Sequence, residues 1–304
     1  MHILITGGTG LIGQHLCKAL LTDGHELTVL SRNPESVPVK CGRGVHAMTA
    51  LAEWDSGKTF DAVINLAGEP IADARWTALR KQILWSSRVT LTEELVRHIA
   101  AAENKPKVFL SGSAVGYYGN RSDVTLDEQA NTGEDFAAQL CKAWEDAARV
   151  AEQVGVRVCL MRTGLVLSNN SGLLESMLLP FKLGLGARLG NGAQWMSWVH
   201  IDDYIEILLR LLRDIQANGP YNMTAPQPVT NAEFTAVLAK VLHRPALFMI
   251  PAFLLKLAMG ERACLLNEGQ KVLPSKISSI GYQFQFSNLA DALRNLLCEQ
   301  YKVN

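Results

Sequence analysis

Residues 2–13, HILITGGTGLIG, contain the pattern from which the architecture of the chain can be predicted. Its first part, residues 2–6, is a short apolar run that ends at glycines, which is typical of a strand buried on both faces of a parallel sheet. The apolar residues then change to a helical period. Gly7, Gly10 and Gly13 therefore lie between a strand and a helix, with the spacing G-x-x-G-x-x-G. Such a turn presents backbone N–H groups and the positive helix end to a pyrophosphate, and a tight turn without a ligand is the alternative interpretation.

Strands and helices alternate along the chain after this turn. Further strands are predicted at residues 25–30, 61–65, 107–111 and 157–161, and long helical stretches at 76–103 and 136–154. Parallel neighbours need a crossover that is nearly always a right-handed helix, so the pattern predicts an α/β fold with a doubly wound parallel sheet of the Rossmann type. The alternation fades after about Gly164. We therefore expect a dinucleotide-binding domain at 1–164 and a smaller substrate-side domain at 165–304, from which a strand or helix can return to the first.

The composition is that of a globular protein. The 304 residues are 48% hydrophobic and 19% charged, which excludes disordered and fibrous classes. Lys plus Arg and Asp plus Glu each number 29, so no overall field attracts nucleic acid or an anionic membrane, although a local patch can still exist. We therefore expect a small-molecule substrate and no nucleic-acid or membrane partner.

The cysteines and the apolar runs indicate a cellular compartment. The six cysteines show no C-x-x-C pair and no zinc-like spacing, so we expect reduced thiols and no metal site. The N-terminus lacks the pattern of a signal peptide, and charges break every apolar run before the roughly 18 residues that a spanning helix needs. The expected location is the cytoplasm.

The end of the second predicted strand bears on the choice of cofactor. In the usual fingerprint an acidic residue about 20 positions after the glycines receives the ribose hydroxyls and selects NAD. Here the strand ends at Leu30-Ser31-Arg32, and no carboxylate stands there in the sequence. Ser31 and the Arg32 guanidinium can instead donate to a 2′-phosphate. The sequence therefore predicts NADP, with an ordinary surface charge as the alternative interpretation of Arg32.

Motifs along nearly the whole chain resemble those of the extended short-chain dehydrogenase/reductase superfamily, which includes nucleotide-sugar epimerases. More narrowly, they resemble its atypical "epimerase family" branch, which is similar to NAD-dependent epimerases and dehydratases. The matching segments are GGTGLIG at 7–13, NLAG at 65–68, SGSA at 111–114, RTG at 162–164, WVHIDD at 198–203 and GQKVLP at 269–274.

The resemblance implies which residues hold the cofactor besides Ser31 and Arg32. They are Gly7, Thr9, Gly10, Leu11, Ile12, Gly13, Leu66, Ala67, Gly68, Arg88 and Val166. Residues 66–68 would pass under the adenosine side through their main-chain atoms, and Val166 would run along the nicotinamide. Arg88 stands where extended members usually carry an asparagine, so it would reach a phosphate or an acidic substrate, and a helix-surface arginine is the alternative.

The resemblance also implies hydride transfer between a nicotinamide and a carbinol carbon, with the proton moved by a tyrosine. A lysine four residues later on the same helix face lowers the pKa of that tyrosine, and a serine orients the carbonyl. Ser113 fits the serine and Lys142 fits the lysine, but the tyrosine position is Ala138. Tyr117 and Tyr118 follow Ser113 closely, and either could donate the proton from a loop, although loop tyrosines often only pack.

Three interpretations of function follow. In the first, the protein is an NADP-dependent oxidoreductase or epimerase, an isomerase, whose proton donor is Tyr117, Tyr118 or a water held by Ser113 and Lys142. In the second, it binds NADP(H) without hydride chemistry, as a sensor or regulatory module. In the third, the fold is structural and the nucleotide pocket a relic, against which the intact glycine turn argues. The substrate, small or nucleotide-linked, and the oligomeric state stay open.

Two helix starts are predicted in the second part of the chain. His200 precedes Asp202 and Asp203, and we expect it to be structural, with one of the aspartates capping the helix that begins there. Thr230 and Glu233 have the spacing of a capping box for a helix over residues 231–242.

Overall fold

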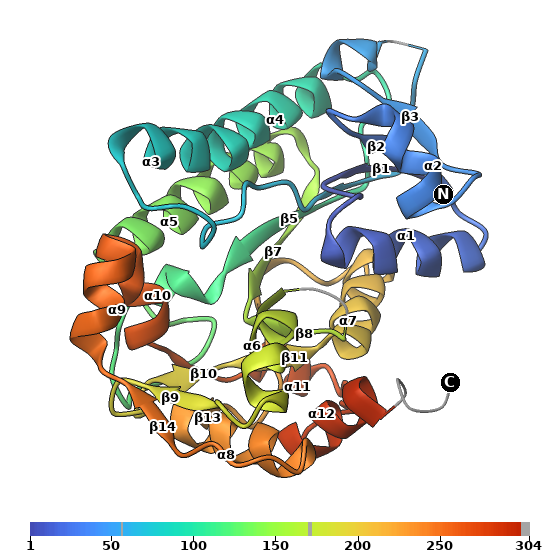
Figure 1. Ribbon diagram of the computed structural model, residues 1–304. Coiled ribbons are helices and arrows are strands. Elements are labelled where there is room, and N and C mark those ends of the chain that lie inside the picture. The colour runs from blue at the N-terminus through green and yellow to red at the C-terminus, as the bar shows by residue number, and fades with distance from the viewer. Residues whose placement is uncertain (56, 170–171, 299–304) are drawn as a thin grey trace.

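The computed structural model describes residues 1–55, 57–169 and 172–298, and its centre is a parallel sheet (Figure 1). The seven strands stand in the order β12-β7-β5-β4-β1-β2-β3, and each neighbouring pair is parallel. Their bounds are β1 (His2–Thr6), β2 (Glu26–Leu30), β3 (His46–Met48), β4 (Ala62–Asn65), β5 (Val108–Ala114), β7 (Arg157–Thr163) and β12 (Gly219–Met223). The predicted α/β class and doubly wound sheet are confirmed.

Two edge strands of this sheet were not among the strands expected from the sequence. β3 has two exposed residues of its three, so it carries no apolar run that would reveal it. β12 lies after residue 164 and pairs with β7, with Tyr221 opposite Met161. The later part of the chain therefore completes the sheet that the earlier part begins.

Helices cover both faces of the sheet. The longer ones are α1 (Leu11–Thr22), α3 (Ala78–Trp85), α4 (Leu91–Ala101), α5 (Phe136–Arg149), α6 (Gly172–Lys182), α7 (Ile201–Arg213), α8 (Asn231–Val241), α9 (Ala252–Met259) and α12 (Leu289–Cys298). Ile3 and Ile5 belong to the core with α1 and α7, whereas Leu4 belongs to the core with α4. Successive strand residues point to opposite faces, which produces these two cores. In Figure 1, α3, α4 and α5 lie above the sheet, and α1 and α7 lie below it.

The two long helical stretches are interrupted in the structure. Residues 76–103 form α3 and α4, joined by one π-helical turn at Ser86–Thr90. The stretch 136–154 is α5 followed by a 3₁₀ turn, Val150–Val154. In both places the chain stays helical and only the hydrogen-bonding pattern changes. The spacing of apolar residues alone therefore does not reveal these interruptions.

Short elements make up much of the rest of the chain, most of them after residue 164. They are β6 (Thr125–Leu126), β8 (Leu165–Leu167), β9 (Ala187–Leu189), β10 (Trp195–Met196), β11 (Trp198–His200), β13 (Val229–Thr230), β14 (Phe248–Ile250), β15 (Lys271–Val272), α2 (Val37–Cys41) in the first part, α10 (Cys264–Asn267) and α11 (Ser275–Ser279). The small strands pair two by two, β8 with β11, β9 with β14, β10 with β13 and β6 with β15. They surround one end of the main sheet (Figure 1).

The start of α7 differs from its expected form. His200 itself is the N-cap, because its Nδ1 accepts from the Asp202 N–H at 3.1 Å, so the prediction of an aspartate cap is wrong. Asp203 is fully buried and accepts from the Tyr282 hydroxyl and from two backbone N–H groups, all within 2.9 Å. Its carboxylate therefore fastens the C-terminal segment to α7. The Thr230–Glu233 capping box of α8 is confirmed.

Two further properties concern only the part of the chain that the structure describes. No helix there is both long and apolar enough to cross a membrane. No group of three or more His, Cys, Asp or Glu side chains in those residues is arranged to hold a metal ion.

Candidate cofactor and catalytic site

The three spaced glycines of the first turn differ in the space that surrounds them. Gly7 has a φ of +70°, and a Cβ there would lie 2.6 Å from the Leu66 carbonyl group. A Cβ on Gly13 would lie 2.3 Å from the Gly7 oxygen, so these two glycines allow the chain to pack on itself. Gly10 has an ordinary φ of −79°. A Cβ there would meet only the Gly7 oxygen, at 3.3 Å, and the space beyond Gly10 is therefore not filled by the protein.

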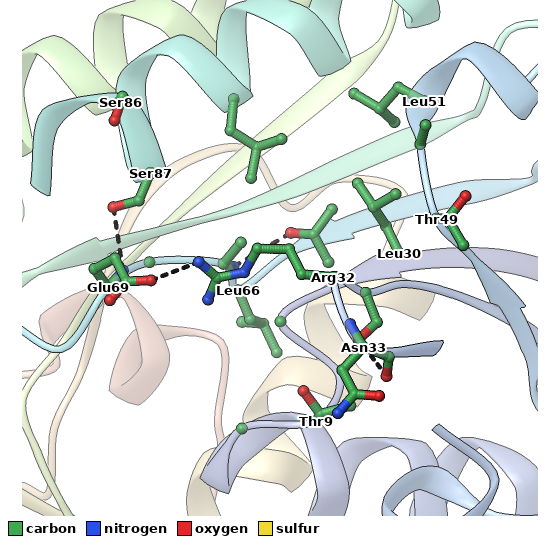
Figure 2. Close-up of a pocket in the computed structure, with 18 of the residues that line it drawn as sticks. Thr9, Leu30, Arg32, Asn33, Thr49, Leu51, Leu66, Glu69, Ser86 and Ser87 are labelled. Atoms are coloured by element: carbon green, nitrogen blue, oxygen red, sulfur yellow. Dashed lines mark hydrogen bonds and ion pairs between the residues drawn. The ribbon is translucent and has the colours of Figure 1, made fainter. Parts of the chain in front are cut away.

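That space belongs to a cavity of about 820 Å³ at the carboxyl ends of β1, β2 and β4 (Figure 2). The predicted cofactor residues that line it are Gly7, Thr9, Gly10, Ser31, Arg32, Leu66, Ala67 and Gly68. The cavity volume lies in the range of sites that bind small molecules and cofactors. Ligands of open α/β sheets bind at this edge, where helix N-termini also point. The residues present fit a dinucleotide, because the glycine turn leaves room for a pyrophosphate.

Lys40 was missed by the sequence reasoning and lines the same cavity as Ser31 and Arg32. It is exposed on the short helix α2, so two cations from different segments line the cavity. The other missed lining residues include Asn33, Ser36, Thr49, Ser87 and Glu94. Since α2 has five residues, with a proline near its start, no apolar period marks it in the sequence.

Arg32 has a carboxylate partner that the sequence did not reveal. Its Nη1 lies 2.8 Å from Oε1 of Glu69, which follows β4 in the chain, and Figure 2 shows the Arg32 side chain extending toward it. The hydrogen bond from Arg32 lowers the pKa of the Glu69 carboxyl, and Arg80 lies 3.6 Å away on the other side. Arg32 is almost fully exposed, so this ion pair is weak and can yield to a phosphate.

Five of the predicted cofactor residues lie outside the lining of this cavity. Leu11, Ile12 and Gly13 form the first turn of α1, and Val166 lies in β8, paired with β11. Arg88 is also outside it: its Nη2 donates to the Glu69 carbonyl at 2.9 Å, and its guanidinium packs under Gly68. Arg88 therefore supports the loop that lines the cavity. That all five bind the cofactor stays a prediction.

A second, buried polar cluster lies at the carboxyl ends of β5 and β7. The Ser113 hydroxyl donates to Oε1 of Glu145 at 2.7 Å, and Arg162 holds the same carboxylate through Nε at 2.8 Å and Nη2 at 2.9 Å. The side chains of Arg162 and Glu145 are each only 2% exposed. Burial alone would lower the pKa of Arg162, but its hydrogen bonds with Glu145 outweigh this and raise that pKa. In this arrangement the Ser113 hydroxyl donates its hydrogen bond to Glu145.

Glu145 was missed by the sequence reasoning, although a signal for it exists. It lies seven residues after Ala138 and four after Cys141, on the buried face of α5. A charged residue on the apolar face of a helix indicates a buried partner, because an unpaired buried charge is strongly unfavourable. The partner, Arg162, lies in the RTG motif that carried the family resemblance.

The two candidate tyrosines occupy different environments around Arg162. Tyr118 is fully buried, donates to Oδ1 of Asn222 at 2.6 Å and accepts from Arg162 at 2.9 Å. Burial raises its pKa to about 12. Tyr117 is half-buried, and its ring lies 3.6 Å from the Arg162 guanidinium carbon. Tyr118 is therefore enclosed by partners, whereas Tyr117 retains contact with solvent.

Lys142 and Ala138 are one turn apart on α5 but differ in exposure. Lys142 is exposed, and its Nζ lies 2.5 Å from Asp146. The hydrogen bond to Asp146 raises the pKa of Lys142. Ala138 is fully buried. A tyrosine ring at 138 would therefore require the surrounding core residues to move.

The chain is similar in sequence and in fold to several known proteins. The family model of the NAD dependent epimerase/dehydratase family matches residues 3–224, and that of a domain of unknown function, DUF1731, matches residues 250–296. Epimerase family protein YfhF of Bacillus subtilis is 37% identical, with 100% of each chain covered. The crystal structure of the human epimerase family protein SDR39U1 (isoform 2) with NADPH has a TM-score of 0.89 at 36% identity, covering 97% of this chain and 99% of that one. UDP-glucose 4-epimerase of Thermotoga maritima shares the fold, with a TM-score of 0.81 at 16% identity and 99% of each chain covered.

Proposed function

Because this chain belongs to the NAD-dependent epimerase/dehydratase family, we propose that it binds NADP(H) in the 820 Å³ cavity at the glycine turn. The observation that carries the proposal is the open space beyond Gly10, at the edge of the sheet where a helix begins. A pyrophosphate at that position accepts from backbone N–H groups and faces the positive end of α1. The NADPH in the human relative's crystal structure supports the same cofactor here.

The 2′-phosphate is the group that distinguishes NADP from NAD, and Arg32 and Lys40 would hold it. Arg32 would exchange the Glu69 carboxylate for the phosphate, an exchange of one charge-assisted pair for another. A bond of this kind contributes about 1.5–3 kcal/mol, or roughly 10- to 100-fold in affinity. Preference for NADPH over NADH should therefore depend on Arg32.

Calorimetry with the intact protein tests the cofactor. The unmodified protein should bind NADPH more tightly than NADH by roughly 10- to 100-fold, and Arg32→Ala should remove most of that difference while leaving NADH affinity unchanged. Arg97→Ala, an exposed arginine on α4 outside the cavity, is the matched control. Equal affinities for NADPH and NADH in the unmodified protein would show that the 2′-phosphate site has been misassigned.

We propose further that the protein is an oxidoreductase or epimerase in which Tyr117 moves the proton. A bound dihydronicotinamide supplies a hydride to a carbonyl carbon. Tyr117 would give its phenolic proton to the carbonyl oxygen and recover one from solvent, with which its half-buried side chain keeps contact. The Arg162 guanidinium lies against the ring of Tyr117 and so fixes where the phenol stands. Tyr118 is less suited to the task, because its hydroxyl is buried between Asn222 and Arg162.

Turnover with a panel of small carbonyl compounds and nucleotide sugars tests this role. Tyr117→Phe should lower turnover by about 10²–10⁴-fold while NADPH affinity stays the same, because a general acid acts on the chemical step. Tyr118→Phe is the neighbouring control and should retain turnover to the extent that it remains folded.

The alternative function is a non-catalytic NADP(H)-binding sensor or regulatory module. Two observations favour it: Ala138 carries no phenol, and Lys142 is paired with Asp146. Under this alternative the protein binds NADPH but turns over no member of the panel, and Tyr117→Phe changes nothing. The two functions are thus separated by turnover, whereas cofactor binding is common to both.

A further inference from the structure

The second part of the chain carries an exposed apolar surface whose residues do not line the cofactor cavity. All three residues of β14 are exposed, and Leu247 before it is 86% exposed. The next helix, α9, exposes Phe253 to 68% and Leu257 to 75% of their surface. In Figure 1, β14 and α9 lie on the outer rim of the molecule. We call residues 182–189 together with 244–257 the apolar rim.

The two segments of the apolar rim are one continuous surface. β14 pairs with β9 in a two-stranded parallel sheet, with Met249 opposite Arg188. Before the strands, Nε of Arg244 donates to the Lys182 carbonyl at 3.0 Å. Parallel strands are normally covered on both faces, and a strand pair that exposes Phe248, Met249 and Ile250 together is expected to be covered by something else.

The charges on the apolar rim have one sign. Lys182, Arg188, Arg244 and Lys256 are exposed, and neither residues 176–201 nor 234–260 contain an aspartate or a glutamate. The whole chain is neutral, with 29 basic and 29 acidic side chains, so this is a local separation of charge. A second copy of the same surface would bring like charges together, and the occupant is therefore expected to be anionic.

We propose that the apolar rim docks on the surface of an anionic lipid bilayer. Phenylalanine and aliphatic side chains beside Lys and Arg are the composition of segments that lie in the membrane interface, with the apolar side chains among the acyl chains and the cations at the headgroups. Protein interfaces are instead centred on Trp, Tyr and Arg in pockets, and the large exposed apolar side chains of the rim include no Trp or Tyr.

This docking surface differs from the expectation drawn from overall charge. A net charge of zero describes attraction at long range, whereas binding to a bilayer depends on the charges within about a Debye length of the headgroups. The apolar rim supplies such charges, with no acidic residue in its own segments. The surface is separate from the cofactor cavity, so the proposal does not depend on the cofactor or on hydride transfer.

Sedimentation of the full-length protein with vesicles tests the docking. Vesicles of phosphatidylcholine containing one third phosphatidylglycerol should carry the protein down at low salt, and vesicles of phosphatidylcholine alone should carry down much less. Leu257→Ser and Lys256→Glu should each weaken partitioning by about tenfold, through the loss of apolar burial and of headgroup attraction respectively. Ile215→Ser and Lys18→Glu are the matched controls. Ile215 is exposed just after α7 and Lys18 is exposed on α1, so both lie outside the apolar rim.

Each other outcome would overturn the proposal. No sedimentation of the unmodified protein with anionic vesicles would do so, and so would equal losses in the rim variants and their controls. A dimer in light scattering that Leu257→Ser dissociates, without vesicle binding, would assign the rim to a second copy of the chain. Binding to polyglutamate but not to vesicles, with loss in Lys256→Glu, would assign it to an acidic protein.

Discussion

Gly10→Val should separate cofactor binding from folding. The φ of Gly10 is −79° and its ψ is 178°, a conformation that valine adopts readily, and a Cβ meets only the Gly7 oxygen at 3.3 Å. We therefore expect the variant to fold with a change in stability of less than about 1 kcal/mol, partly offset by the smaller freedom of its unfolded chain. The valine methyl groups would occupy the space that the pyrophosphate needs.

The size of the effect follows from linkage. NADPH at about 100 times its Kd stabilises the folded state by about 2.7 kcal/mol, which is roughly 4 °C in Tm for a chain of this size. Gly10→Val should lose this rise, while the far-ultraviolet circular dichroism and the Tm without cofactor stay near those of the unmodified protein. Thermal unfolding with and without NADPH measures both quantities.

Gly44→Val is the matched control. Gly44 is exposed, has open space where a Cβ would be, and does not line the cavity, so the variant should retain the full rise in Tm. Gly13→Val should fail to fold, because a Cβ there lies 2.3 Å from the Gly7 oxygen. If Gly10→Val keeps the full rise in Tm with NADPH, the pyrophosphate does not bind at this turn.

Four other predictions concern single features. Lys40→Ala should weaken NADPH binding by roughly 3- to 10-fold in calorimetry and leave NADH unchanged; a change in both would mean that Lys40 does not contact the 2′-phosphate. Ala138→Tyr should lower the free energy of unfolding by about 1–3 kcal/mol in urea and gain no reductase activity, since Ala138 is fully buried; a gain would show that the ring finds space. Arg162→Ala should cost about 3–5 kcal/mol, and Arg162→Met combined with Glu145→Leu less, because only the first leaves a buried charge unpaired; equal costs would contradict this. Asp203→Ala should cost about 3 kcal/mol or more, because three donors lose their acceptor, and a cost under about 1 kcal/mol would be inconsistent with the burial of this carboxylate.

Local patterns predicted the parts of the site that one segment builds. The glycine turn could be located from spacing alone, since strand, turn and helix are consecutive in the chain. The Thr230–Glu233 box was equally local. Residues that meet from distant segments were not predictable in this way: Glu69 reaches Arg32 across 37 positions, and a sequence shows that a carboxylate is absent from a strand end but not which loop returns to it.

The catalytic side shows the same division. The helix of Ala138 and Lys142 was expected and observed, yet the direction of the Lys142 side chain depends on Asp146, and the use of the Ser113 proton depends on Glu145. Each of these partners is a choice among several nearby polar groups. Which choice is made follows from burial, because the buried Glu145 needs every donor within reach, whereas the exposed Lys142 does not.

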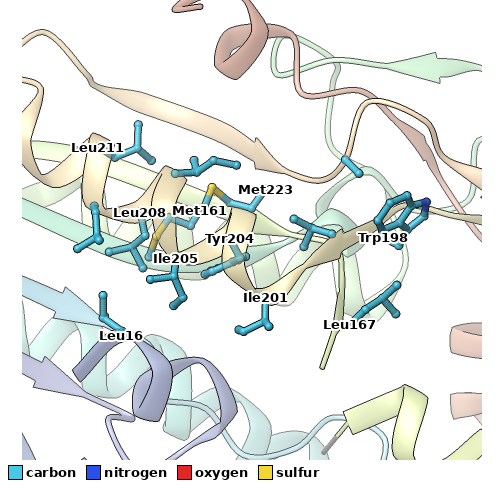
Figure 3. Packing of buried hydrophobic residues seen from close by; sticks show 14 of the residues in the cluster. Leu16, Met161, Leu167, Trp198, Ile201, Tyr204, Ile205, Leu208, Leu211 and Met223 are labelled. Carbon is cyan, nitrogen blue, oxygen red and sulfur yellow. The ribbon is translucent and has the colours of Figure 1, made fainter. Parts of the chain in front are cut away.

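The position of β12 has a consequence for synthesis of the protein on the ribosome. β7 ends at Thr163 and its outer neighbour β12 begins at Gly219, so more than fifty residues are added before that edge can be paired. At about 5–20 residues per second this takes roughly 3–10 s. During that time β7 offers an unpaired apolar edge to other nascent chains. Figure 3 shows Met161 of β7, Leu208 of α7 and Met223 of β12 in one cluster. Strand β12 therefore both pairs with the edge of β7 and covers the core beside it. Ribosome pausing between residues 164 and 219 should therefore increase aggregation more than pausing after β12 has emerged.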